Sequence, residues 1–247
     1  MVWLLLFSIT FGGVQSPSLN DYFERSIAVN INDEHNKKHV LKVVASYKYN
    51  AEVLEDAQRQ AVNLLAYEFE HRATPTEELV LTYHKCLDNE VQLNRKTINC
   101  RLKIQHNIND EEWKVILSDL SEQGRLHENH LDWTHEKLEE SFDVLRTNLN
   151  DHIADEAKRS VVLDAFTEHE KQVMGAIDSI QSLRDYRNVV VNNIKSTRKD
   201  LERLQDGRYK IQTHLFDTYI VFHKVFVENT TEEEWTSLLK EVKPMIY

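Results

Sequence analysis

One short segment, HENHLDWTHE, concentrates side chains that could bind a metal ion or carry a proton: His127, His130, Asp132 and His135. A zinc site on a helix needs its ligands to converge on one point. At about 100° per residue, His130 and His135 point away from each other by roughly 140°, and His127 falls between them on an apolar stripe. We therefore interpret the segment as surface histidines rather than a metal-binding or pH-sensing site, and we expect no metal ion.

Sequence motifs of the common enzyme classes are missing from the chain. Bundle di-iron sites use Glu-x-x-His on two helices, and the nearest match, Asp132-x-x-His135, occurs once. The chain has no GxSxG, no GxxxxGK[ST], no GxGxxG and no HExxH. We expect neither enzymatic activity nor a cofactor.

The two cysteines, Cys86 and Cys100, present a conflict. Two cysteines in an exported chain normally form a disulfide, whose Cα atoms lie within about 7 Å of each other. One continuous helix would instead hold these residues about 21 Å apart. We predict the disulfide, with Asp88 to Asn99 folding back as a loop; the alternative is a straight helix with two small core residues.

Export is predicted from the beginning of the chain. Val2 to Phe11 is an unbroken apolar run followed by small residues, which is typical of a secretory signal peptide over residues 1–16. Because a membrane span needs about 20 apolar residues, we expect a secreted, extracellular protein without a transmembrane segment.

Composition predicts an all-α fold. Between Pro75 and Pro244 the chain has no proline and only three glycines, Gly124, Gly175 and Gly207, so turn-rich β architectures are disfavoured. A formal net charge of −11 argues against nucleic acid as a partner. We expect an elongated bundle of about six helices, with an N-terminal part over residues 17–124 and a long-helix part over residues 125–247 that could form one continuous domain.

Three segments share a helix-starting signature: Asn30 to Glu34, Asn107 to Trp113, and Asn229 to Trp235. The last two continue similarly, as EEWKVIL and EEWTSLL. Because the three are unequally spaced, we interpret them as convergent capping, with an ancient duplication as the alternative.

The clearest apolar periodicity is a heptad pattern over residues 173–204, which predicts a coiled-coil seam about 48 Å long and a surface for oligomer formation. Asp206-Gly207 is expected to end that helix, and Ser121 to Arg125 to break the chain near its middle.

Two groups are candidate binding residues. The basic stretch from Arg184 to Lys210, which overlaps the seam, could bind an anion through Lys195, Arg198, Lys199 and Arg203, or could simply neutralise neighbouring acidic helices. The last long helix could line a cavity for a small apolar ligand with Phe216, Tyr219, Phe222 and Phe226; the alternative is an ordinary packed core.

A glycan is predicted at Asn229, which begins the chain's single N-x-[ST] sequon. Together these features favour a secreted, non-enzymatic binding protein that acts by surface contacts or an apolar groove, a profile common in body fluids such as saliva and venom. The alternative is an exchangeable lipid-surface or hydrophobic-ligand-binding protein of the apolipoprotein type.

Overall fold

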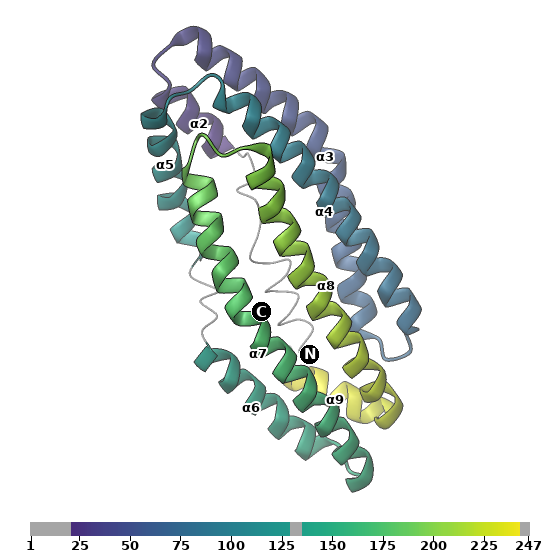
Figure 1. Cartoon of the computed structure of the whole chain (residues 1–247). Coiled ribbons are helices and arrows are strands. Elements are labelled where there is room, and N and C mark those ends of the chain that lie inside the picture. Colours follow the sequence, from purple (N-terminus) through teal and green to yellow (C-terminus); the bar gives the residue numbers. More distant parts are fainter. Residues whose placement is uncertain (1–20, 129–134, 243–247) are drawn as a thin grey trace.

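A computed structural model describes residues 21–128 and 135–242, and Figure 1 shows these ranges as an elongated bundle. The described chain is helical throughout, as expected, but forms eight helices rather than about six. They are α2 (Asp21–Asn30), α3 (Glu34–Glu70), α4 (Thr76–Gln105), α5 (Asp110–Glu128), α6 (His135–His152), α7 (Glu156–Asn192), α8 (Arg198–Asn229) and α9 (Glu232–Val242).

The signal-peptide prediction, residues 1–16, lies outside the described residues, and so does most of the histidine segment, residues 129–134. None of the described helices combines the length and the apolar character needed to cross a bilayer.

Two long helical hairpins form the body of the molecule. Helix α3 packs along α4, α7 packs along α8, and α4 and α8 bring the two hairpins together. The shorter helices lie at opposite ends, with α2 and α5 packed together at one end and α6 and α9 at the other (Figure 1). The largest apolar cluster draws residues from both halves of the sequence, among them Leu65 and Tyr83 from one and Phe166 and Phe222 from the other.

The two halves of the chain repeat each other at a constant offset. Glu34 and Glu156, the first residues of α3 and α7, lie 122 positions apart, and so do their last residues, Glu70 and Asn192. The same offset separates the starts of α4 and α8, the starts of α5 and α9, and the ends of α2 and α6.

The repeated helices also repeat their hydrogen bonds. In each half, one glutamate in the last helix accepts two backbone N–H groups, one from that helix's own cap residue and one from the loop before the long helix. These are Glu112 with Asn109 (3.0 Å) and Asn32 (3.0 Å), and Glu234 with Thr231 (2.8 Å) and Ala154 (2.9 Å).

This correspondence favours the duplication over our interpretation of convergent capping. Asn107 and Asn229 occupy the same position of the repeat, 122 residues apart, whereas the segment at Asn30 precedes α3 and corresponds to the start of α7. The three starts are unequally spaced because they represent two different positions of one repeat.

Helix ends are set by capping residues rather than by glycine. Helix α7 ends at Asn192, and α8 begins after Thr197, whose side chain and Asp200 form a capping box. The predicted seam therefore is not one helix, and its apolar positions, such as Val173 and Leu201, are buried within the molecule. This removes the basis for an oligomer surface over residues 173–204.

Two predicted helix breaks are wrong, because the chain stays helical at both positions. Helix α5 continues through Ser121 to Arg125, and α8 continues through Asp206-Gly207. At Gly207 a Cβ would lie 2.8 Å from Cδ1 of Leu183 on α7, so this glycine permits a close approach of the two helices rather than ending one.

Replacing glycines in the hairpin tests this packing. We expect Gly175→Ala to raise the free energy of unfolding by about 0.5–1 kcal/mol, because Gly175 lies in a helix interior with nothing within 4 Å of an added Cβ. Gly207→Ala should gain less, because Leu183 must move to admit the methyl group. Urea unfolding measures both, and an equal gain would contradict the close contact at Gly207.

Candidate functional site

The polar groups nearest the middle of the bundle join α4 to α8. Glu90 and Gln212 occupy equivalent repeat positions and contact each other, Gln212 Nε2 donating to Glu90 Oε2 at 3.3 Å. Arg208 forms an ion pair with the same carboxylate, and both charged side chains are largely buried. Nearby, Asn94 Nδ2 donates to the Tyr209 hydroxyl at 2.7 Å.

This network is suited to holding helices together rather than to catalysis. Burial raises the pKa of Glu90, whereas the positive charge of Arg208 opposes that rise. Burial also raises the pKa of Tyr209 to about 12. A general acid or base must reach a substrate, but Glu90 is only 7% exposed and already accepts from two partners on α8.

A second buried carboxylate joins α3 to α4. Thr82 Oγ1 donates to Glu68 Oε1 at 2.9 Å, and burial raises the pKa of Glu68. Both residues are buried within the hairpin, so this contact also stabilises helix packing.

Two histidines lie in the main core among aromatic rings. His169 stacks on Phe222 with ring centroids 5.7 Å apart, and His223 meets the Trp235 ring edge-on at 5.7 Å. Both imidazoles are at most 2% exposed. No well-formed hydrogen bond reaches their ring nitrogens within the described chain, although the Thr218 backbone comes near His169.

Different residues occupy the positions equivalent to these histidines in the first half of the repeat. His169 and Tyr219 correspond to Tyr47 and Thr97, which are hydrogen-bonded at 2.9 Å in the other half. His223 corresponds to Arg101, which lies over the ring of Trp113 just as His223 lies against Trp235. The first half therefore pairs these side chains with polar partners, whereas the second half surrounds its two histidines with aromatic rings.

These buried histidines make stability depend on pH. Burial lowers the pKa of His169 and of His223 from 6.5 to about 4, so both are neutral in the folded protein at pH 7. The unfolded chain binds more protons below pH 6.5, and folding stability therefore falls as the pH drops from 6.5 towards 4. Each group should account for a loss of about 3 kcal/mol over that window.

Replacing one histidine by an aromatic ring tests this contribution. We expect His169→Phe to lose less stability between pH 7 and pH 4.5 than the parent does, measured by denaturant unfolding at several pH values. The exposed His214 on the neighbouring helix α8 provides the control, and His214→Phe should retain the parent's profile. Parallel profiles for His169→Phe and the parent would show that burial does not perturb His169.

The predicted apolar lining forms part of the packed core. Phe216 stacks on Tyr83 with centroids 3.7 Å apart, and Phe222 stacks on Phe226 at 5.6 Å. Tyr219 contacts the ring of Phe69 at 5.0 Å. These contacts favour an ordinary core over a ligand cavity at this helix.

The structure corrects the predicted disulfide. Cys86 and Cys100 are free and buried on one continuous helix, α4, which holds them about 21 Å apart. Residues 88–99 do not fold back. Burial raises the pKa of each thiol to about 12, so both remain protonated and unreactive.

The basic residues considered for anion binding do not form one cluster. Lys195 approaches Asp110 at 3.9 Å, Arg198 donates to Asn99 at 2.6 Å, and Arg203 lies over the Tyr186 ring at 5.0 Å. Lys199 lies exposed on α8. Three of these four cations thus contact neighbouring helices, but only Lys195 approaches an acidic side chain there, so these contacts do not decide between anion binding and neutralisation.

Lys195 also lines an open hollow between the loops that follow α4 and α7. His106, Asp110 and Glu111 contribute to its wall together with Thr197. The acidic side chains in this wall disfavour an anion there.

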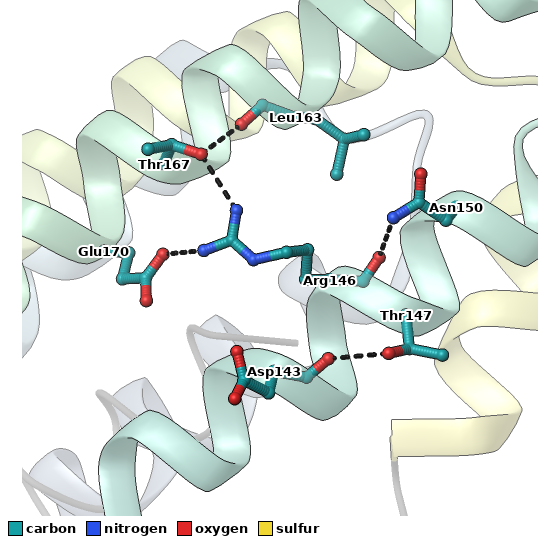
Figure 2. A network of polar contacts seen from close by, with 7 residues as sticks. All are labelled: Asp143, Arg146, Thr147, Asn150, Leu163, Thr167 and Glu170. Carbon is teal, nitrogen blue, oxygen red and sulfur yellow. Dashed lines mark hydrogen bonds and ion pairs between the residues drawn. The ribbon is translucent and has the colours of Figure 1, made fainter.

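Arginine also fastens α6 to α7. Figure 2 shows Arg146 reaching across from α6, with Nη1 donating to Thr167 Oγ1 at 3.0 Å and Nη2 paired with Glu170. The guanidinium also lies 5.6 Å from the ring centroid of Phe166. This contact holds a short helix against the main core.

The predicted glycosylation site lies at the end of α8. Asn229 is half-buried and donates from Nδ2 to the Val225 carbonyl at 2.8 Å, while Thr231 caps α9 in its place. The glycan at Asn229 stays a prediction.

Four exposed apolar side chains lie along one face of α3, a feature that our sequence analysis missed. Tyr49, Val53, Leu64 and Tyr67 are 79, 75, 44 and 59% exposed. At about 100° per residue they lie within about 60° of one another around the helix. We call these four residues the α3 stripe. The signal was a second apolar periodicity on α3, opposite its buried residues such as Val44 and Leu65.

Among residues 21–128 and 135–242, no three His, Cys, Asp or Glu side chains are placed to hold a metal ion. No protein-family model matches the chain, and neither a curated protein nor a solved structure shows significant similarity to it.

Proposed function

We propose that this chain is a secreted, non-enzymatic interaction protein that binds a partner through the α3 stripe. The observation that carries the proposal is the exposure of four large apolar side chains along one face of one helix. Such patches on soluble proteins commonly mark interaction sites, whereas single exposed apolar residues need no explanation.

The interior offers less support for a binding or catalytic role. The carboxylates of Glu90 and Glu68 are engaged by neighbouring helices, and the aromatic residues of α8 contact one another. The outer surface is therefore the better candidate for a contact with another molecule.

Comparison of α3 with α7, its equivalent in the second half, indicates which apolar residues of the α3 stripe the fold does not require. Tyr49 and Val53 correspond to Lys171 and Gly175 on α7, a helix with the same length and the same packing role. Because α7 folds with a charged residue and a glycine at these positions, the large apolar side chains of Tyr49 and Val53 are not required for helix packing.

A photo-crosslinking experiment tests this surface. Benzoylphenylalanine placed at Tyr49 should form specific crosslinks to protein in the fluid into which the chain is secreted, or to the chain itself. The same residue placed at the equivalent Lys171 is the matched control and should form few. Equal crosslinking from both positions, or none from Tyr49, would contradict a contact through the α3 stripe.

Lipid vesicles test the alternative, a lipid-surface protein. Trp113 and Trp235 are at most 5% exposed, so their emission reports any opening of the bundle. We expect vesicles to leave tryptophan emission and helicity unchanged. A shift in emission together with a change in helicity would favour the lipid-surface function instead.

A further inference from the structure

We infer that the occupant of the α3 stripe is a second copy of this chain, packed antiparallel across a two-fold axis near residue 58. This inference rests on the proposed function, because it names the partner of the same surface. Its support comes from the spacing of the side chains, from the charges beside them, and from the area that they offer.

The spacing makes the stripe its own complement. A two-fold interface brings a patch against itself, so its contacts must be matched about a midpoint. Tyr49 and Tyr67 lie nine positions on either side of residue 58, and Val53 and Leu64 lie five and six positions from it. In an antiparallel pair, Tyr49 of one copy therefore meets Tyr67 of the other copy. Val53 of one copy likewise meets Leu64 of the other.

Charges along one edge of the stripe suit the same arrangement. Asp56 and Arg59 lie on either side of the midpoint and already pair within each helix. Reversing one helix places Arg59 of one copy beside Asp56 of the other, so opposite charges meet across the axis. In a parallel two-fold pair, this edge would lie on opposite sides of the interface in the two copies, so Asp56 and Arg59 would not meet across the axis.

One tyrosine of the stripe is held by a neighbouring ring. Tyr67 and His71 lie one helical turn apart, with ring centroids 3.8 Å apart. This contact limits the freedom of the Tyr67 side chain before association and so reduces the entropy lost on binding.

The available area indicates a weak, reversible dimer. An aromatic side chain buries about 150–250 Å² when fully covered. Two copies of the stripe, each with two tyrosines, one valine and one leucine, would therefore bury on the order of 1,000 Å² in total, at the low end of specific interfaces.

Sedimentation velocity on the full secreted chain tests the dimer. Over about one to several hundred micromolar, the range suited to so small an interface, the parent should shift from monomer towards dimer. Val53→Glu, beside Glu52 and Asp56, should remain a monomer throughout. The matched control is Val189→Glu, since Val189 is 67% exposed on α7 at the position equivalent to Tyr67. This variant should associate like the parent.

Spin labels test the orientation. Cys86 and Cys100 are buried, so added surface cysteines can be labelled selectively. Labels at Gln60, near the proposed axis, should lie close together in the dimer, whereas labels at Lys38, near one end of α3, should lie far apart. Short distances at both positions would indicate a parallel pair and overturn the antiparallel arrangement.

Other outcomes separate this inference from the proposed function. A parent that stays monomeric over the whole range, or association weakened equally by Val53→Glu and Val189→Glu, overturns the dimer. If Tyr49 then still crosslinks to a different protein, the proposed function stands with another partner. If Tyr49 crosslinks to nothing, both fail.

Discussion

The mutual docking of the two halves is the contact on which the rest of the structure depends. Trp113, on the last helix of the first half, donates from Nε1 to the Val191 carbonyl near the end of α7, at 3.0 Å. Trp235, its equivalent in the second half, donates to the Glu70 carbonyl at the end of α3, at 3.2 Å. Each half thus satisfies one of the free carbonyl groups at the end of the other half's longest helix.

This arrangement explains why the interior polar groups lie where they do. Glu90 and Gln212 meet because equivalent positions of two interlocked halves approach each other near the middle of the molecule. The buried ion pair of Glu90 with Arg208 lies at the same contact between α4 and α8. Removing one partner of such a pair leaves an uncompensated buried charge and destabilises the fold. The role of Glu90 and Arg208 is therefore structural.

Divergence between the halves is therefore more informative about function than either half alone. Inside the bundle, His169 and His223 occupy the positions of Tyr47 and Arg101, and these differences give the second half a pH-dependent contribution to stability. On the surface, Tyr49 and Val53 of the α3 stripe correspond to Lys171 and Gly175 on α7. Helix packing thus does not explain why apolar side chains occur at the proposed interaction surface.

The all-helical class followed from the scarcity of glycine and proline, and the helix starts at Asp110 and Glu232 followed from the capping residues just before them. The helix ends were missed because glycine was read as a break. Gly207 lies inside α8, whereas the turn over residues 193–197 contains neither glycine nor proline. The side-chain caps of Asp155 and Thr197 mark those boundaries instead.

The errors at the candidate sites have a similar origin. For the cysteines, the usual behaviour of exported chains was given more weight than the helical spacing, and the spacing was right. The seven-residue pattern over residues 173–204 continued in register across a turn, so periodicity alone could not reveal two antiparallel helices. The α3 stripe was visible as periodicity, but only the structure distinguishes the exposed face of α3 from the buried one.

Native-state hydrogen exchange tests the central claim, that the two halves form one interlocked unit. The slowest amide protons of α4 and of α8 should exchange through the same global unfolding, with free energies that agree within about 0.5 kcal/mol. A difference of several kcal/mol, with one hairpin opening while the other stays protected, would contradict a fold built on mutual docking.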